Sequence, residues 1–198
     1  MGPVGVPGLL LAGGITVYGH QFGWACDKIV NYEVVLSSGD IVNANASCFP
    51  DLFWALKGGG KNFGIVTRFD IETIASPKIW GGLHVISPEY MDQYLGVSLF
   101  ASGIFFGGSG RLLTVHSPQA LATYAANIYD PRSHATPSIF SGAMDAAAAL
   151  LFYDSDEVSD PEILKPFTDI PAVYSTVGFR TLASMADETQ AIVIRGIK

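Results

Sequence analysis

Two groups of closely spaced glycines are the residues of this sequence best suited to holding a ligand. The first group contains Gly5, Gly8, Gly13 and Gly14. Glycine lets a backbone run close to a planar or phosphorylated ligand and present N–H groups that no side chain screens. The same spacing also fits a tight turn that enters a helix, and from the residues alone the turn is the favoured interpretation.

The second group, Gly58–Gly60, lies between two lysines and looks like a nucleotide phosphate loop. That loop requires a glycine where Ala55 stands and a hydroxyl where Asn62 stands. The dinucleotide pattern G-x-G-x-x-G also fails, because Phe63 occupies its last position. The sequence therefore disfavours ATP hydrolysis and Rossmann-type NAD binding.

Other residues that carry chemistry are scattered. Cys26 and Cys48 lack metal-ligand spacing, and we expect two buried thiols rather than a disulfide. Among the histidines only His84 lies on a predicted strand of the second half of the chain, and isolated histidines are mostly surface or structural residues. The other three are His20, His116 and His134. No Ser-His-Asp order or telling carboxylate pair is present, so the catalytic residues stay unknown and no metal site is predicted.

The regular pattern between residues 23 and 74 predicts the elements that position the glycines. Alternation from Val30 to Leu36 predicts a strand with Val30, Tyr32, Val34 and Leu36 on one face. Ser38-Gly39-Asp40 supplies turn chemistry, so Val30–Ala44 is predicted to be a β-hairpin.

A short helix and a third strand follow. Pro50 fits a first helical turn, and Gly58–Gly60 ends the helix. The helix carries an apolar stripe of Leu52, Phe53 and Leu56. A strand from Ile65 is predicted to place Ile65, Thr67, Phe69, Ile71 and Thr73 on one face and Arg68, Asp70 and Glu72 on the other.

Several blocks carry a resemblance to a known family. They are LLLAGGI (Leu9–Ile15), GWACD (Gly23–Asp27), NYEVVL-x-x-G-x-IVNANA (Asn31–Ala46) and PDLFWALKGGG-x-NFGIVTRFD (Pro50–Asp70). Their order and spacing resemble the FAD-binding domain of vanillyl-alcohol oxidase/p-cresol methylhydroxylase (PCMH-type) flavoproteins. The match is best to the fungal berberine-bridge-enzyme-like FAD-linked oxidoreductases.

The resemblance implies an α+β fold. Residues 1–76 correspond to the C-terminal half of a PCMH-type FAD-binding domain, and residues 77–198 correspond to part of a substrate domain, an antiparallel sheet covered by helices. By comparison with the family, the chain is expected to be a fragment truncated at both ends.

The resemblance also implies FAD as the cofactor. The glycine segment would flank the ribityl and pyrophosphate groups, although Ala12 stands where the family usually has a third glycine. The strand that begins near Gly64 would meet the adenine. The implied FAD-binding residues are Gly5, Val6, Gly8, Gly13, Gly14, Gly64, Ile65 and Val66. Met1 stands where some members carry a flavin-linking cysteine, so FAD is expected to be non-covalent if it is bound.

The implied activity is oxidation of a small organic substrate by hydride transfer to flavin, with O2 as the acceptor, in fungal secondary metabolism. Two alternatives stay open. One is a truncated, non-catalytic remnant that does not bind FAD. The other is a flavin-scaffold cyclase that makes no net redox change.

Composition limits the class of protein. The 198 residues are 49% hydrophobic and 15% charged, which indicates a globular chain. The net charge of −7 and the lack of a basic cluster argue against nucleic-acid binding. The apolar runs at 9–12 and 97–106 are too short to span a membrane. The N-terminus shows no signal peptide as it stands, although full-length relatives are often secreted, and nothing indicates the oligomeric state.

The second half is less regular. We expect a strand at Trp80–Ile86, and helices at Pro88–Leu95, Gln119–Ile128, Asp160–Leu164 (a capped helix start) and Thr181–Thr189. The alanines of Ala146–Tyr153 favour a helix, but the resemblance to the family implies a strand there. Residues 96–118 have no counterpart in the family. They are interpreted as an insertion, either a translated intron or a long loop of the kind associated with function or disorder.

Overall fold

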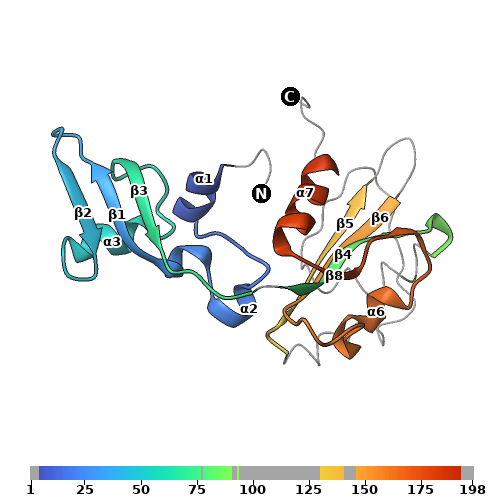
Figure 1. Ribbon diagram of the computed structural model, residues 1–198. Coiled ribbons are helices and arrows are strands. Elements are labelled where there is room, and N and C mark those ends of the chain that lie inside the picture. Colours follow the sequence, from blue (N-terminus) through green and yellow to red (C-terminus); the bar gives the residue numbers. More distant parts are fainter. Residues whose placement is uncertain (1–4, 77, 91–92, 94–129, 141–145, 193–198) are drawn as a thin grey trace. The chain divides into compact units, whose positions relative to one another are not determined.

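The computed structural model describes residues 5–76, 78–90, 93, 130–140 and 146–192 (Figure 1). The chain divides into two compact units, Met1–Ala75 and Ser76–Lys198, and each is described by itself. The first unit contains α1 (Val6–Leu11), α2 (Gly19–Phe22), the 3₁₀ helix η1 (Ala25–Lys28), β1 (Ile29–Val35), β2 (Ile41–Asn45), α3 (Pro50–Leu56) and β3 (Ile65–Ile71).

The three strands of the first unit form an antiparallel sheet in the order β2-β1-β3. The predicted hairpin is confirmed, because β1 and β2 pair directly. Its turn is closed by the Leu36 N–H, which donates to the Asp40 carbonyl at 2.9 Å, and Gly39 adopts a φ of 88°. A positive φ is the conformation for which glycine is favoured in turns.

Two irregularities in the β1–β3 pairing change the predicted faces. Ile29 pairs with Ile71 and Asn31 with Asp70, so Val30 is an extra residue on β1. Ile29 is therefore buried and Val30 is 46% exposed, against the prediction that Val30 lies on the core face. An extra residue in one strand of a pair shifts the side chains beyond it to the other face.

The second irregularity places an extra residue, Thr67, in β3 between the pairs Glu33–Arg68 and Val34–Val66. Val66 and Phe69 pack against the core. Ile65 is 71% exposed, so the predicted alternation that grouped it with Phe69 is wrong. The Thr67 hydroxyl donates instead to the Glu33 carboxylate at 2.7 Å.

The core of the first unit lies between this sheet and α3. The Tyr32 ring meets Phe53 of α3 and Phe69 of β3 edge-on, with centroids 5.8 and 5.6 Å apart. Edge-on aromatic pairs are a favoured geometry. The predicted helix is confirmed, since α3 begins at Pro50, ends at Leu56 and is followed by Gly58 with a φ of 100°.

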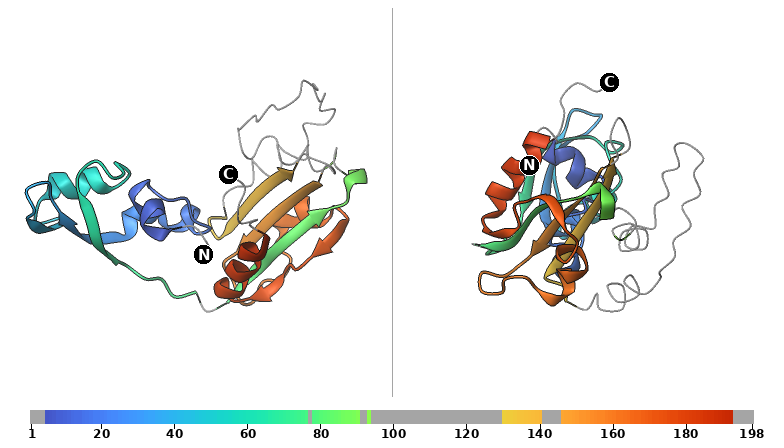
Figure 2. Two further views of the ribbon diagram at one scale, coloured as in Figure 1. Left: turned by 90° about the horizontal axis from the view of Figure 1, so that it is seen from above. Right: turned by 90° about the vertical axis from the view of Figure 1, so that its right-hand side faces the viewer.

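The second unit is built on a five-stranded antiparallel sheet in the order β5-β6-β4-β7, with β8 also paired to β4. Its elements are β4 (Ile79–Ile86), η2 (Pro88–Tyr90), β5 (Ser133–Phe140), β6 (Ala146–Tyr153), η3 (Glu162–Leu164), α6 (Lys165–Thr168), β7 (Ala172–Ser175), β8 (Gly178–Arg180) and α7 (Leu182–Ile192). Leu164 and Phe167 pack on one face of the sheet with Trp80 and Leu151. The helix α7 lies on the other face (Figures 1 and 2). The predicted α+β class and the antiparallel sheet covered by helices are confirmed.

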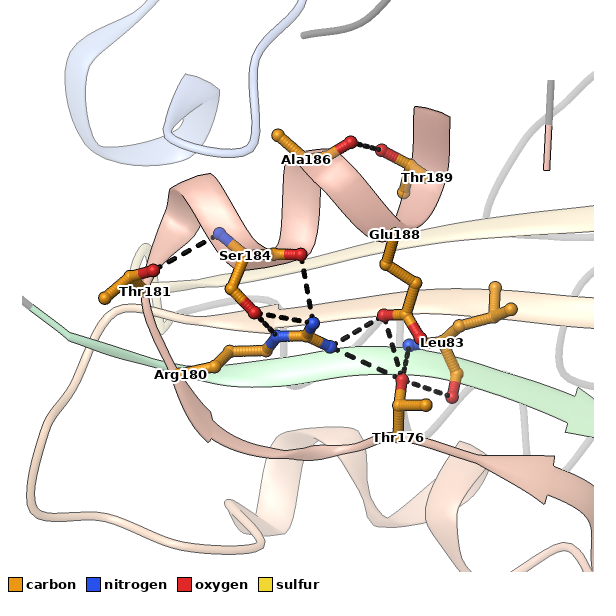
Figure 3. Close-up of polar contacts among 8 residues, drawn as sticks. All are labelled: Leu83, Thr176, Arg180, Thr181, Ser184, Ala186, Glu188 and Thr189. Atoms are coloured by element: carbon orange, nitrogen blue, oxygen red, sulfur yellow. Dashed lines mark hydrogen bonds and ion pairs between the residues drawn. The ribbon is translucent and has the colours of Figure 1, made fainter. Parts of the chain in front are cut away.

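One edge of β4 is shared by two strands. β7 pairs with residues 84–86 and β8 with residues 79–81. Thr176 fills the interval between them, because its N–H donates to the Leu83 carbonyl at 2.9 Å and its hydroxyl accepts the Leu83 N–H at 3.0 Å (Figure 3). A Cβ at Gly82 would lie 2.7 Å from the Thr176 carbonyl oxygen, so this crossing requires glycine.

The other predictions for the second half have mixed outcomes. The predicted strands correspond to β4 and β6, and the predicted final helix corresponds to α7. Of the predicted helix Pro88–Leu95, the described residues form a 3₁₀ turn at Pro88–Tyr90, and Gln93 is α-helical. The segments 96–118 and Gln119–Ile128 lie outside the described residues.

The predicted capped helix start is wrong in its detail. A helical turn does begin at Glu162, but Pro161 is the N-terminal flanking residue and no side chain caps the turn. Asp160 has a φ of 49°, and its carboxylate accepts the Thr168 hydroxyl at 3.0 Å. The carboxylate therefore binds the far end of α6 instead of the free N–H groups at the start of the turn.

Among the helices of the described ranges, none has the length and apolar character needed to cross a bilayer. The same part of the chain holds no group of three or more His, Cys, Asp and Glu side chains arranged to bind a metal ion.

Candidate functional site

The glycine segment that ends α1 is fastened to η1 by its backbone. Gly13 and Gly14 have φ values of 97° and 83°, and their carbonyl oxygens accept the N–H groups of Cys26 and Ala25, each at 2.9 Å. A Cβ at Gly14 would lie 2.8 Å from the Ala25 Cβ. Packing within the unit therefore suffices to explain Gly14.

Close packing within the first unit also explains why residue 64 is a glycine. Its φ is 146°, and a Cβ there would lie 2.7 Å from both Val34 Cγ1 and the Val35 carbonyl oxygen. Of the two residues that follow, Ile65 is exposed and Val66 packs on the core. Within the described sheet β3 is an edge strand, so one of its backbone edges is unpaired by other strands.

Gly5 and Gly8 differ, because packing within the unit explains neither of them, whereas at Gly13 the φ of 97° by itself favours glycine. A Cβ at Gly5 or Gly8 would meet nothing within 4 Å, and one at Gly13 would meet only Trp24 Cε3, at 3.6 Å. Val6, between the first two, is 45% exposed. These positions leave the backbone of α1 and its C-terminal end open to close approach by another group.

A hollow of about 420 Å³ lies between the end of α1, η1 and α3. This volume falls within the range of about 300–1,000 Å³ typical of small-molecule sites. The residues that line it are Ala12, Gly13, Trp24, Cys26, Asp27, Trp54 and Lys57. Gly13 is the one residue shared by this wall and the FAD-binding residues predicted from the sequence.

Two of the residues that line the hollow are exposed tryptophans. Trp54 is 79% exposed and Trp24 is 55% exposed, and the Asp27 carboxylate accepts the Trp24 backbone N–H at 3.1 Å. Sequence reasoning missed both tryptophans. Trp54 carried a usable signal, because at 100° per residue it lies opposite the stripe formed by Leu52, Phe53 and Leu56.

Lys57 supplies positive charge at the same place. Its Nζ lies 4.4 Å above the centroid of the Phe53 ring, a cation–π contact. No ion pair involves Lys57 within the described parts of the chain. Asp27 also lines the hollow, so Lys57 shares this wall with a carboxylate that does not form an ion pair with it.

The two cysteines are both free, as expected, but only Cys26 is buried and Cys48 is exposed. Burial raises the pKa of the Cys26 thiol, the Asp27 carboxylate raises it further, and Lys57 opposes both. The protonated thiol is a poor nucleophile. The prediction of two buried thiols is therefore wrong for Cys48, whose position after β2 leaves it at the surface.

His84 is a structural residue of β4. Only 5% of it is exposed, and its Nε2 lies 2.9 Å from the Ile170 carbonyl oxygen. That oxygen only accepts, so Nε2 carries a proton, while Nδ1 faces the Ser175 hydroxyl at 3.1 Å. His116 lies outside the described residues. The described histidines thus give no reason to assign a catalytic base.

The residues around the hollow fit part of FAD. An open glycine backbone suits a phosphate-bearing chain, exposed indoles suit a planar ring, and a lysine without an ion-pair partner among the described residues suits an anion.

No family model matches the chain. Among curated proteins, it is 36% identical to the FAD-dependent monooxygenase prx3 of Penicillium roqueforti over 197 residues, which cover 96% of this chain and 34% of that protein. It is 52% identical to the FAD-dependent monooxygenase FUP4 of Fusarium proliferatum over 150 residues, which cover 73% and 29%. The chain thus spans about a third of the length of the curated relatives it matches.

Solved structures share its fold. The 6-hydroxy-D-nicotine oxidase of Arthrobacter nicotinovorans aligns over 98% of this chain and 39% of its own, with a TM-score of 0.70 and 22% identity. The glucooligosaccharide oxidase of Acremonium strictum, described with a 6-S-cysteinyl, 8α-N1-histidyl FAD, aligns over 98% and 37%, with a TM-score of 0.66 and 22% identity.

Proposed function

Because the chain belongs to the fungal FAD-linked oxidoreductases of the vanillyl-alcohol-oxidase type and spans about a third of their length, we propose that its first unit forms part of the FAD site of an FAD-dependent oxidoreductase. Relatives over most of this chain are named FAD-dependent monooxygenases. FAD is accordingly the cofactor that this family uses.

The observation that carries the proposal is the open space next to the backbone at Gly5, Gly8 and Gly13, where a side chain would meet few or no atoms. A side chain at the first two positions would meet no atom of the described chain within 4 Å. Glycine within a helix is unfavourable by about 0.5–1 kcal/mol relative to alanine. Of these positions only Gly8 lies within α1, and no internal packing compensates for it. Close approach of the cofactor to α1 would supply the missing reason.

In the proposed site two backbone stretches contact FAD. The segment that contains Gly5, Val6, Gly8, Gly13 and Gly14 would hold the ribityl and pyrophosphate groups, and the unpaired edge of β3 at Gly64, Ile65 and Val66 would hold the adenine. Backbone N–H and C=O groups at a strand edge can pair with a heteroaromatic ring by ordinary hydrogen bonds. Gly14 and Gly64 serve this site by letting η1 and β1 pack closely behind it.

When bound, FAD supplies a two-electron acceptor for a hydride from a small organic substrate, with O2 as the final acceptor. The task of this chain is to bind and orient the cofactor. We propose that neither cysteine of this chain links FAD covalently, since Cys26 is buried with a raised pKa and Cys48 lies outside the wall of the hollow.

The test is a titration of the purified chain with FAD, followed by denaturation with acid. Non-covalent binding predicts a saturable flavin spectrum whose chromophore returns to the supernatant after precipitation. Absence of binding would identify a non-catalytic remnant. Product formation that proceeds without O2 and without net oxidation would identify a cyclase instead of an oxidase.

A further inference from the structure

We propose that the hollow between α1, η1 and α3 binds the planar heteroaromatic ring of a phosphate-bearing ligand, with Trp54 and Trp24 as the stacking surfaces and Lys57 as the anion contact. The inference rests on the proposed function, which assigns the adenine of FAD to β3 and so leaves the isoalloxazine ring for the hollow. It adds residues outside the glycine and β3 segments to that site.

Two exposed indole side chains provide surfaces on which a planar ring can stack. Trp54 and Trp24 expose 79% and 55% of their surfaces, and both line one hollow. An indole left in water forfeits the free energy that burial of its large apolar surface would provide. Aromatic side chains that present a face to solvent are the usual platforms for heteroaromatic bases, because every such base has a π-face.

Both indoles are held in place by their backbones. Trp24 precedes η1, where the Asp27 carboxylate accepts its N–H at 3.1 Å, and Trp54 lies within α3. Gly23, just before Trp24, has a φ of 78°, and a Cβ there would lie 3.1 Å from Asp27 Oδ2. This local requirement fixes the start of η1 and hence the base of the Trp24 side chain.

Lys57 places a positively charged ammonium group at the hollow. Lys57 lines the hollow together with Asp27, but in the described part of the chain no carboxylate forms an ion pair with Lys57. Its ammonium group is kept close to the protein by the Phe53 ring, 4.4 Å away. A lysine so placed favours an anionic ligand, and a phosphate next to a stacked ring meets both requirements.

Gly13 joins the glycine segment to the hollow. It belongs to the open glycine segment and to the wall of the hollow, and a Cβ there would approach only Trp24. A ligand that follows the backbone of this segment therefore reaches the indoles without crossing a side chain at Gly13. One continuous ligand can occupy both places.

The experiment measures dissociation constants of the full chain and its variants by calorimetry, with FAD, FMN and AMP as probes. W54A should weaken FAD binding about tenfold, within the range for loss of one stacking platform. W54F should restore most of the affinity. F179A, which removes an exposed aromatic side chain from the second unit, is the matched control and should leave the affinity unchanged.

The charge contact is tested in parallel. K57Q should weaken FAD binding several-fold and reduce its salt dependence, whereas K61Q, a neighbouring lysine outside the wall of the hollow, should do neither. FMN carries isoalloxazine and AMP carries adenine, so the probe whose affinity falls in W54A identifies the stacked ring.

The outcomes separate this inference from the proposed function. FAD binding that is equal in the wild type, W54A and K57Q overturns the inference and leaves the proposed function standing. If FAD does not bind but FMN or AMP binds and W54A weakens it, the ring site stands while the proposed function fails. No binding of any probe overturns both.

Discussion

Arg180 at the end of β8 donates from Nη1 to the Glu188 carboxylate of α7 at 2.6 Å, and each of the two side chains is 16% exposed (Figure 3). The Thr176 hydroxyl donates to the same carboxylate at 3.0 Å, and the guanidinium also donates to Ser184. This group of side chains ties α7 to the interval in β4 between β7 and β8.

R180A should therefore destabilise the second unit by about 2–4 kcal/mol, because it leaves a mostly buried carboxylate without its partner. Urea unfolding followed by the fluorescence of buried Trp80 measures the change. K165A breaks the exposed pair with Glu162 and should have no measurable effect. The double variant R180M/E188L should recover much of the loss, and a loss as large as that of R180A would contradict this explanation.

Asp130 should make stability depend on pH. The hydrogen bond from Arg132 lowers the pKa of the Asp130 carboxyl to about 2, with partial burial opposing it and the Tyr153 hydroxyl assisting. A lowered folded-state pKa stabilises the fold above the ordinary value of 3.8, and that contribution disappears as the pH falls toward 2. The contribution at pH 7 should be about 1 kcal/mol, because solvent screens the pair.

The measurement is the difference in unfolding free energy between the wild type and D130N from neutral pH downward. The difference should be largest near neutrality and shrink as the pH approaches 2. A difference that does not change with pH would show that the carboxylate charge contributes nothing.

Gly14 and Gly8 should respond oppositely to alanine. G14A forces a Cβ to within 2.8 Å of Ala25 at a φ of 83°, and should destabilise the first unit by about 1–3 kcal/mol. G8A meets open space within α1 and should stabilise it by up to about 1 kcal/mol while weakening FAD binding. Thermal unfolding and an FAD titration of both variants check this, and unchanged FAD affinity in G8A would count against ligand contact at α1.

Removal of the hydroxyl group should have different effects on stability at Tyr32 and at Tyr153. The Tyr32 hydroxyl is buried without a hydrogen-bond partner among the described residues, and burial raises its pKa to about 12. Y32F should therefore be neutral or stabilising by about 1 kcal/mol. The Tyr153 hydroxyl donates to Asp130 at 2.6 Å, so Y153F should cost about 1–3 kcal/mol. Denaturant unfolding that ranks the two variants in the opposite order would refute the assignment.

Local patterns predicted the local structure well. The hairpin, α3, β4 and α7 follow from signals that lie next to one another in the sequence, whereas β6 was predicted only from the family resemblance, because its alanines favour a helix. The irregularities at Val30 and Thr67 were missed, because they arise from the pairing of strands about forty residues apart. Alternation within one strand contains no information about its partner's register.

The candidate site also contains features that the sequence predicted and features that depend on tertiary contacts. The glycines were visible in the sequence, but the reason for each was not, since Gly14 and Gly64 depend on contacts with Ala25 and Val34. The exposure of Trp24 depends on how η1 packs, which no local pattern contains. The contact between Arg180 and Glu188 joins a strand to a helix and likewise had no sequence signal.

If the first unit forms part of an FAD site, the purified chain should bind added FAD. The most direct test is the absorption spectrum of the purified chain with and without added FAD, followed by acid precipitation. We expect a bound flavin spectrum and release of the flavin into the supernatant. Failure to bind FAD at micromolar concentration would contradict the claim.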